Sequence, residues 1–534
     1  MDGIQLSSWI VILALIMGAY FSFINTLGSN NELREPLAAQ TSIPYIGHAL
    51  GLMRSKFNYY VDLSHKTLEP ILTVTLSGTK MYIVNSLPLI QSIQKQPKDL
   101  AFPPIEAKFA NQICGVSPEA SKILMSNVNG DDGNFGLSME SYHAMRGALT
   151  PGSGLDQMNR IMIQNVAASL DDLMPSGKKS VNIKLSEWLR RVVTKATTNS
   201  VYGPQNPFKE AGVQDSFWQF ESQLMTTLVG FLPSVFARTG IAARARVVTA
   251  FERYFEAGGY KEASILMQSR YETGAKNGVS VSDIARYEVG YAIAILVNTA
   301  PAAFWIMFFL YSNPSLLQEI REELDAIMEV SLDSNNKTIR TLDITNVKAS
   351  CPLLLSVYQE SLRHLSMGTS VREVVRDTVL EGKWLLKKDS MIQMPSRIIH
   401  MDSTIWGSDV EEFNPRRFLK NNGKTGTQKR PNTAAFRTFG GGSTLCPGRH
   451  FATNEVLAVE SMFVMRYDMK PAAGTTWSIP KTENTNVAAV IMEPDTDIDA
   501  IVSVREGFED GRWAFGLRDS KIIFAVVEED RVGE

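Results

Sequence analysis

The most continuous apolar stretch of the chain lies near its N-terminus, where no charged residue occurs between Gly3 and Asn31. Its centre, residues 9–24, reads WIVILALIMGAYFSFI. With its apolar flanks the stretch is long enough to cross a bilayer as a helix, which takes about 20 residues. A cleaved signal peptide is the alternative, but it begins with basic residues and ends at a small-residue site, whereas Asp2 is acidic. We therefore predict a retained transmembrane anchor.

A second apolar stretch covers residues 287–311 and is nearly free of charge. It is apolar on all sides rather than along one stripe, which predicts a buried helix. A second membrane span is the alternative. However, Asn298, Thr299 and Pro301 interrupt the apolar run, and charged helices flank it closely. We predict a core helix that Pro301 kinks, because proline cannot donate an N–H within the helix.

The remaining pattern is mainly helical between about residues 150 and 330. The segment SNPSLLQEIREELDAI reads as a capped amphipathic helix, and LLLSVYQESLRHL as another. Short β-like runs include ILTVTL, MYIV and TVLEGKW. No Pro/Gly/Ser-rich linker follows about residue 50. The pattern therefore predicts a mainly α fold with small β-sheets (α+β). An anchor and connector would occupy residues 1–35, and one catalytic domain residues 36–534.

Composition narrows the class of protein. The apolar fraction is 44% and the charged fraction 20%, which are ordinary values for a globular chain. The net charge is −3, from 53 basic and 56 acidic residues, so the basic surplus of a nucleic-acid binder is missing. The three cysteines, Cys114, Cys351 and Cys446, are far apart. This spacing argues against a disulfide scaffold or a structural zinc site and favours a reduced, cytosol-facing body.

The segment with the clearest chemistry is FRTFGGGSTLCPGRHFATNEV, residues 436–456. Its glycines permit unusual backbone angles and close approach of a flat ligand. Pro447 suits the first turn of a helix, whose N–H groups would favour the Cys446 thiolate. A lone cysteine is more often a small core residue. A phosphate loop is excluded because no Gly-Lys-Ser/Thr follows, and a nucleophile elbow because Leu445 replaces its second glycine.

Phe439, Gly442, Cys446 and Gly448 fit the F-x-x-G-x-x-x-C-x-G signature, and this segment resembles the cytochrome P450 superfamily. The resemblance implies haem b, iron protoporphyrin IX, as cofactor. It further implies that Cys446 is the axial ligand and metal-binding residue, with the other three positions against the haem. Thiolate ligation favours cleavage of the O–O bond.

Two arginine motifs occur in the order typical of that superfamily. Glu360 and Arg363 form E-x-x-R in YQESLRH and share one helix face. Downstream, FNPRRF (residues 413–418) matches the second arginine motif, with Arg417 at its key position. The resemblance implies that these three residues lock together and brace the cysteine loop, which makes them structural.

Further residues are implied as haem contacts. Tyr142 and Arg146 match a W-x-x-x-R motif whose arginine binds a haem propionate, with tyrosine in place of tryptophan. Arg372, in SVREVVRD, is expected at the other propionate, and a surface arginine is the alternative. Thr444 stands where many relatives carry a basic haem contact, so we expect that contact to be lost.

The core helix departs from the superfamily pattern. An acid–threonine pair that helps deliver protons to oxygen is expected at positions 297 and 298, where this chain has Val297 and Asn298. Thr299 is one residue further along and could substitute. We therefore take Asn298 and Thr299 as the candidate catalytic residues. The alternative is that Asn298 merely satisfies the kinked helix.

This helix resembles one branch, the sterol 7α- and 12α-hydroxylases and prostacyclin synthase, which share an asparagine followed by a proline. The leading hypothesis is a monooxygenase that uses O2 and electrons from a membrane-bound NADPH-cytochrome reductase. Its substrate would be a bulky apolar molecule, such as a sterol, a terpenoid or another polycyclic secondary metabolite. The alternatives are a redox-neutral haem isomerase or dehydratase of the prostacyclin-synthase type, and a non-catalytic haem- or sterol-binding protein.

The same resemblance implies a single-pass protein of the endoplasmic reticulum membrane, with membrane lipid around its anchor and the catalytic body in the cytosol. Positive charge for reductase docking is expected on the cysteine side, from Lys429, Arg430, Arg437, Arg449 and His450. The expected pocket segments are residues 102–113, 217–236, 296–304, 367–371 and 487–491.

Overall fold

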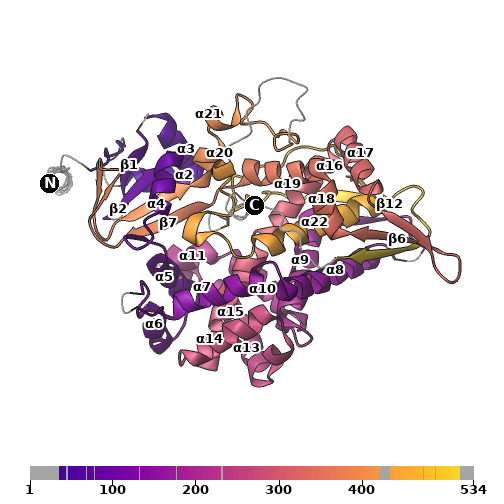
Figure 1. Ribbon diagram of the computed structural model, residues 1–534, viewed down its shortest axis with the longest axis horizontal. Helices are drawn as coiled ribbons and strands as arrows, with labels where there is room; N and C mark the ends of the chain where they lie inside the picture. The colour runs from indigo at the N-terminus through magenta and orange to yellow at the C-terminus, as the bar shows by residue number, and fades with distance from the viewer. Residues whose placement is uncertain are drawn as a thin grey trace, which may run out of the picture. The chain divides into compact units, whose positions relative to one another are not determined.

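The computed structural model describes residues 35–517, except residues 42, 44–45, 68, 77, 131–132, 176, 230–232, 420–432, 473 and 487–488. The predicted membrane anchor lies outside the described residues. The chain divides into two compact units (Figure 1). The smaller unit comprises Met1–Phe102 and Thr369–Ile398, and the larger comprises Pro103–Gly368 and Ile399–Glu534.

The smaller unit is built on a five-stranded sheet in the order β1-β2-β10-β7-β3. These strands are β1 (Ile71–Leu76), β2 (Thr79–Val84), β10 (Met391–Pro395), β7 (Thr369–Val374) and β3 (Leu100–Ala101). The remaining elements are α2 (Gly47–Ser55), α3 (Asn58–His65), α4 (Leu87–Gln94), β8 (Thr378–Leu380) and β9 (Trp384–Leu386). The β-like runs predicted from ILTVTL, MYIV and TVLEGKW therefore correspond to β1, β2 and the β8–β9 pair.

One face of this sheet packs on α3. Tyr60 and Leu63 of α3 join Leu72, Val74, Met81, Ile83 and Ile398 in one apolar cluster. β1 and β2 pair antiparallel, so that Leu72 lies opposite Ile83 and Val74 opposite Met81. Alternate residues of a strand share one face, which places these four side chains on the face that α3 covers.

The larger unit is mainly helical. Its helices are α5 (Pro103–Cys114), α6 (Pro118–Met125), α7 (Leu137–Leu149), α8 (Ser153–Leu173), α9 (Leu185–Tyr202), α10 (Val213–Glu221), α11 (Leu224–Val229), α12 (Pro233–Phe236), α13 (Arg238–Glu256), α14 (Ile265–Lys276), α15 (Val281–Leu296), α16 (Thr299–Tyr311), α17 (Pro314–Asp325), α18 (Ile344–Ser350), α19 (Pro352–Leu365), α21 (Ser403–Trp406) and α22 (Arg449–Arg466). The short helix α20 (Ser396–His400) lies where the chain passes into this unit.

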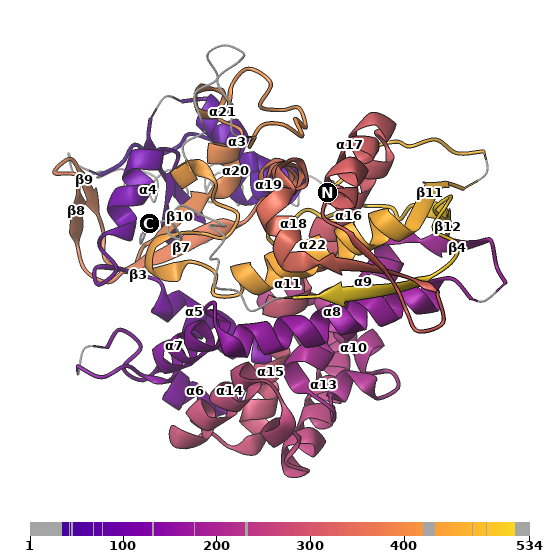
Figure 2. The ribbon, with the colours of Figure 1, turned by 45° about the vertical axis from the view of Figure 1, so that its right-hand side comes forward.

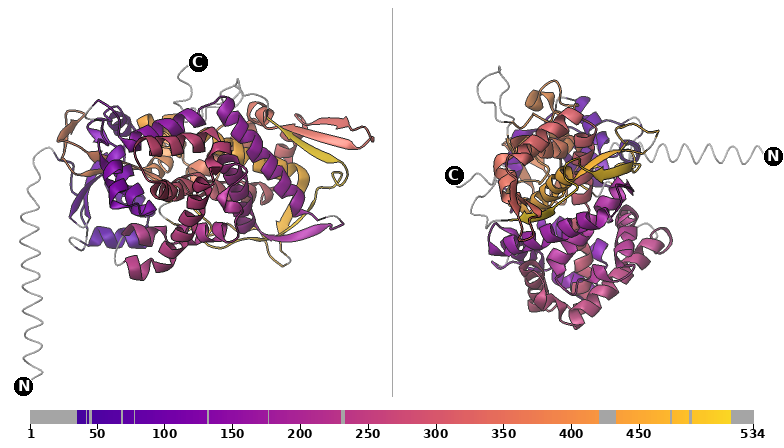
Figure 3. Two further views of the ribbon diagram at one scale, coloured as in Figure 1. Left: turned by 90° about the horizontal axis from the view of Figure 1, so that it is seen from below. Right: turned by 90° about the vertical axis from the view of Figure 1, so that its right-hand side faces the viewer.

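Two small sheets complete the larger unit. One has the order β11-β12-β4, from β11 (Tyr467–Pro471), β12 (Asp499–Val504) and β4 (Ser180–Lys184). The other has the order β13-β6-β5, from β13 (Arg512–Gly516), β6 (Thr338–Asp343) and β5 (Glu329–Leu332). The β5–β6 hairpin, salmon in Figure 3, extends beyond the helices of this unit. Together with the helices, the sheets agree with the mainly α fold with small sheets that the pattern predicts.

The centre of the larger unit is a group of helices in which α8, α9, α16 and α22 pack against one another (Figures 1 and 2). All thirteen residues of α16 are buried. The continuous stretch Val281–Tyr311 is long and apolar enough to cross a membrane, but 78% of its most apolar part is buried inside the protein. The prediction of a core helix at residues 287–311 is therefore confirmed.

That helix is interrupted between α15 and α16. α15 ends at Leu296 and α16 begins at Thr299, with Asn298 as the residue before its first turn. Pro301 has no N–H to donate to the carbonyl of Val297, four residues earlier, so the regular ladder cannot continue there. The predicted kink thus has its cause in the local sequence.

Candidate active site

Cys446 lies at the end of a tight loop, three residues before Arg449, where α22 begins. The backbone N–H of Cys446 donates to the carbonyl of Phe439 over 2.9 Å, which closes the loop. Gly440 and Gly442 take φ angles of +80° and +63°. These left-handed angles cost a side-chain-bearing residue energy but cost glycine little. The glycine run is therefore a conformational requirement of the loop.

The thiol of Cys446 sits against the start of α22. Burial raises its pKa, while the backbone N–H groups of Gly448 and Arg449 and the charge of Arg449 oppose that shift. A Cβ at Gly448 would lie 3.9 Å from the sulfur, which is an ordinary van der Waals contact. Cys114 and Cys351 are buried, whereas Cys446 is partly exposed. Of these three sulfurs, the one in the glycine loop is thus the one that combines access with N–H donors.

Tyr142 connects α7 to this loop. Its hydroxyl donates to the carbonyl of Leu445, the residue before the cysteine, over 3.1 Å. Burial raises the pKa of Tyr142, so the phenol stays a hydrogen-bond donor. Arg146 lies one turn further along α7 and is exposed. The tyrosine that replaces the expected tryptophan therefore keeps contact with the cysteine loop.

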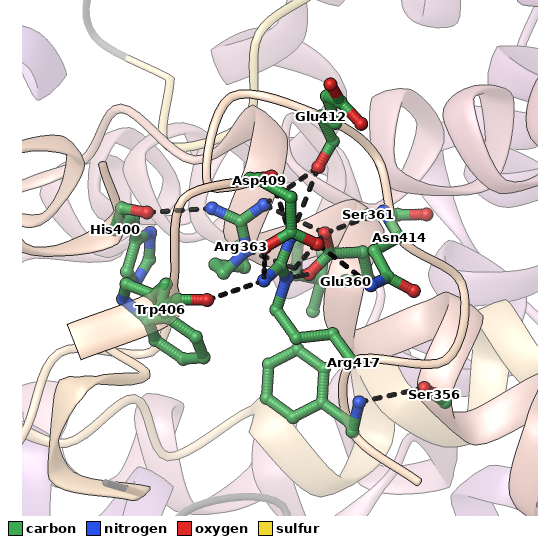
Figure 4. Close-up of polar contacts among 12 residues, drawn as sticks. Ser356, Glu360, Ser361, Arg363, His400, Trp406, Asp409, Glu412, Asn414 and Arg417 are labelled. Atoms are coloured by element: carbon green, nitrogen blue, oxygen red, sulfur yellow. Dashed lines mark hydrogen bonds and ion pairs between the residues drawn. The ribbon is translucent and has the colours of Figure 1, made fainter. Parts of the chain in front are cut away.

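Behind the loop, Glu360, Arg363 and Arg417 form one buried ion-pair cluster (Figure 4). Glu360 accepts hydrogen bonds from Arg363 Nε and Nη2, each at 2.8 Å, and from Arg417 Nε at 3.0 and 3.1 Å. The side chains of Glu360 and Arg363 are 0% exposed and that of Arg417 4%. The predicted association of the two arginine motifs is confirmed.

His400, which no sequence motif predicts, joins this cluster to the cysteine loop. Arg363 Nη1 donates to the carbonyl of His400 over 2.7 Å, and His400 Nε2 accepts the backbone N–H of Arg437 over 2.8 Å. Arg437 begins the segment that leads into the loop. A single histidine in IIHMD has no motif partner at a telling spacing, so no sequence signal pointed to it.

At the helix interruption, Asn298 and Thr299 differ in their contacts. Asn298 Oδ1 accepts the backbone N–H groups of Val490 and Ile491, over 2.7 and 3.4 Å. The side chain of Thr299 is buried, and within the described part of the chain its hydroxyl makes no hydrogen bond. Two of the predicted pocket segments, residues 296–304 and the described part of 487–491, therefore meet at Asn298.

Comparison with known proteins places these features in a family. The family model described as Cytochrome P450 matches residues 258–498, which include the arginine motifs and the cysteine loop. A cytochrome P450 monooxygenase named nodJ, from Hypoxylon pulicicidum, is 35% identical over 499 residues, covering 92% of this chain and 94% of the relative. The chain belongs to the cytochrome P450 family. Like its relatives, this P450 is an oxidoreductase with a haem-iron cofactor, and its electrons come from a reductase partner.

Other relatives of this P450 belong to the sterol hydroxylase branch. Cytochrome P450 7B1 from Mus musculus is 24% identical over 456 residues, covering 82% of this chain and 85% of the relative. A 25-hydroxycholesterol 7-alpha-hydroxylase from Rattus norvegicus is 21% identical over 418 residues, covering 76% and 96%. These relatives confirm the predicted resemblance to the sterol hydroxylases.

The residues of this P450 fit a haem. Among the described residues no group of three or more His, Cys, Asp or Glu side chains could hold a metal ion. A metal that arrives with its own macrocyclic ligands needs only an axial donor from the protein. The single thiol of Cys446, which is partly exposed and lies against the N–H groups of Gly448 and Arg449, matches that requirement.

Three expectations about arginine and histidine side chains need correction. Arg437 and His450 are only 5% and 6% exposed, so they do not provide surface charge for reductase docking. Arg372, in the smaller unit, is 2% exposed, so the surface alternative for it is wrong. Its guanidinium lies 5.6 Å from the ring centre of Phe102. Lys429 and Arg430 lie outside the described residues.

Proposed function

We propose that this P450 is a monooxygenase that hydroxylates a bulky apolar substrate, such as a sterol, a terpenoid or another polycyclic secondary metabolite. The observation that carries the proposal is the Cys446 thiol, held at the N-terminus of α22 by a loop that the Glu360 cluster braces. The name of one relative, a 25-hydroxycholesterol 7-alpha-hydroxylase, supports a sterol as substrate, and the name of nodJ, a monooxygenase, supports the reaction type.

In this proposal the Cys446 thiolate would bind the iron of haem b. Phe439, Gly442 and Gly448 shape the loop around the sulfur, while Tyr142 buttresses it through Leu445. Three arginine or tyrosine positions, Tyr142, Arg146 and Arg372, would face the haem edge and its propionates. A thiolate-bound haem supplies reductive activation of O2 and insertion of one oxygen atom into a C–H bond.

The chain itself supplies orientation, water exclusion and proton handling. The fully buried α16 makes the surroundings of Thr299 apolar and poor in water, which would suit an apolar substrate. Thr299 is the group proposed to pass a proton, because its hydroxyl is both donor and acceptor and makes no hydrogen bond with the described residues. The carboxamide of Asn298 cannot release a proton near neutral pH, and its oxygen is already bonded.

One observation favours a second candidate, a redox-neutral isomerase or dehydratase. The position of the expected acid is occupied by Val297, which is 2% exposed, so no carboxylate assists proton delivery there. An enzyme that rearranges a peroxide would not need that acid. The branch resemblance includes one such enzyme, prostacyclin synthase.

Reconstitution decides between the candidates. The full chain in microsomes is supplied with reductase, NADPH and ¹⁸O2, and sterol and terpenoid substrates are screened by binding spectra and product analysis. We expect product only with NADPH and reductase, with one labelled oxygen atom incorporated. Product formed from a peroxide without electrons would overturn the monooxygenase proposal. Haem binding without any turnover would favour the non-catalytic alternative.

The axial ligand is tested separately. The Cys446→Ser chain should lose the thiolate-type Soret shift in its reduced carbon monoxide spectrum, whereas a Cys351→Ser control should keep it. Cys351 is a suitable control because it is a buried cysteine on the loop before α19, far along the chain from the glycine loop. A Cys446→Ser chain with an unchanged spectrum would contradict the assignment.

We also propose that residues 1–35 anchor the protein once in the endoplasmic reticulum membrane, with the catalytic body facing the cytosol. Ile46, Leu50 and Met53 support this placement. They recur at helical spacing and are 54%, 45% and 77% exposed, so one side of α2 offers apolar surface to lipid just after the anchor. A glycosylation acceptor fused before Met1 should be modified, and one fused after Glu534 should not. The reverse pattern would contradict the proposed orientation.

A further inference from the structure

We infer that Asn298 is a positioning residue. It ties the C-terminal segment of residues 489–492 to the interruption between α15 and α16, and it thereby determines which substrate carbon is presented for oxidation. The inference deepens the proposed function and rests on it for the word substrate. The contact itself joins two segments that lie 192 residues apart in the chain.

The orientation of the Asn298 carboxamide follows from its partners. Val490 and Ile491 offer backbone N–H groups, at 2.7 and 3.4 Å from the carboxamide. A backbone N–H can only donate, so the atom that faces it must be the oxygen of the amide rather than its nitrogen. The Nδ2 group of Asn298 therefore points away from residues 490 and 491. The side chain is thus a fixed acceptor toward the segment.

The N–H groups of Val490 and Ile491 donate to a side chain, that of Asn298, whereas the other described hydrogen bonds of this segment involve backbone carbonyls. The carbonyl of Val490 accepts the N–H of Met367 over 2.8 Å, and the N–H of Met492 reaches the carbonyl of Leu365 over 3.0 Å. Trp305 Nε1 donates to the carbonyl of Met492 over 2.7 Å. These bonds fix the carbonyl of Val490 and both backbone polar groups of Met492. The N–H of Val490 depends on the side chain of Asn298.

Close packing makes the side chains of residues 489–492 sensitive to a shift of the Val490 backbone. Ala489, Ile491 and Met492 are 2–3% exposed. A Cβ placed on Gly368 would lie 2.8 Å from Cγ1 of Val490, so the glycine leaves the room that the valine fills. Interiors packed this closely transmit a displacement rather than absorb it. A shift of the Val490 backbone would therefore move its side chain, at a place where two of the expected pocket segments meet.

Substitutions at position 298 distinguish a positioning role of Asn298 from a role in proton delivery. Asp at position 298 keeps an oxygen acceptor of the same length, so it keeps the hydrogen bond to Val490. Thr or Ala cannot make it, because the hydroxyl of Thr is one bond shorter and Ala has no acceptor. A proton-delivery role predicts another order, in which Thr, the usual residue of the family at this position, performs well.

The test uses the full chain as holoprotein, with the variants Asn298→Asp, Asn298→Ala and Asn298→Thr. Hydrogen exchange of peptides that cover residues 489–492 is measured without substrate. We expect at least tenfold faster exchange of the Val490 amide in the Ala and Thr variants and wild-type exchange in the Asp variant. Equal exchange in all four proteins would overturn the inference. This readout needs no turnover, so it stands even where the proposed function fails.

The second readout is the ratio of hydroxylated products in the reconstituted system. Ala and Thr should change that ratio several-fold and Asp should preserve it, whatever the turnover rate. Gly368→Ala provides an independent variant, because its Cβ displaces Val490 while Asn298 stays intact; it should shift the ratio in the same way. An Ala variant with an unchanged ratio but increased peroxide release per NADPH would overturn positioning and favour proton delivery.

Discussion

Replacing Arg417 by alanine removes the cation that connects Glu360 to the segment before the cysteine loop. Its guanidinium donates from Nε to Glu360, from Nη1 to the carbonyl of Trp406 over 2.7 Å, and from both Nη atoms to Asp409 at 2.9 Å each. The neighbouring Arg416 is the matched control. It pairs with Glu319 over 2.7 Å, but its side chain is 51% exposed.

The expected loss follows from the charges that remain. With Arg417 the buried group is neutral, because two arginines oppose Glu360 and Asp409. Without it, one arginine remains for two carboxylates, and this arginine, Arg363, pairs with Glu360. Glu360 cannot rehydrate at 0% exposure, whereas Asp409, at 32%, can in part. Removing one partner of a buried ion pair costs about 3–5 kcal/mol, and the surviving Arg363 places this case near 3 kcal/mol. Removing Arg416 should cost about 0–1 kcal/mol.

The assay is urea unfolding of the purified holoprotein, followed by the thiolate-type carbon monoxide band and by tryptophan fluorescence. We expect a lower midpoint and a smaller haem-loaded fraction for Arg417→Ala, and near wild-type behaviour for Arg416→Ala. Arg417→Lys should fall between them, because lysine keeps the charge but loses the planar fork. Equal midpoints for the two alanine variants would refute the claim that burial determines how much each ion pair contributes to stability.

Two further predictions concern buried polar groups. Burial raises the pKa of Glu455 to about 8, against a hydrogen bond from Thr197 that lowers it. Because the folded-state pKa is raised, the carboxyl's contribution to stability is complete below its ordinary pKa of 4.5 and is lost as pH rises toward 8. Glu455→Gln should therefore flatten the pH dependence of the unfolding free energy. Parallel curves for the variant and the wild type would contradict this. Tyr142→Phe removes the hydrogen bond to Leu445 and should lower stability by about 1 kcal/mol. It should also speed haem transfer to apomyoglobin, and an unchanged transfer rate would show that Tyr142 does not support the loop.

Much of the candidate site could be predicted because its signals are local. The glycine loop, Pro447 and Cys446 lie within eight positions, where allowed backbone angles and helix-start geometry follow from residue type alone. Glu360 and Arg363 share a helix face because they are three residues apart. The core helix was also predictable, since a run that is apolar on every side has no face to give to water.

Other residues could not be placed in this way, because burial and partners depend on distant segments. Arg437 and His450 read as surface charge beside a loop, yet both are buried. The sequence allows both a surface and an interior position for Arg372, and only its burial in the folded chain distinguishes them. His400 links Arg363 to Arg437 only because α20 places it between them.

The central helix shows which features follow from the sequence and which depend on the tertiary structure. The sequence by itself determined the interruption, because Pro301 removes an N–H four residues after Val297. It also determined which residue types stand there, Asn298 and Thr299, and left their roles open. Only the tertiary structure decided that the oxygen of Asn298 is bonded to Val490 while the hydroxyl of Thr299 makes no hydrogen bond with the described residues. A hydrogen bond across 192 positions depends on how the chain folds back, which no local spacing encodes.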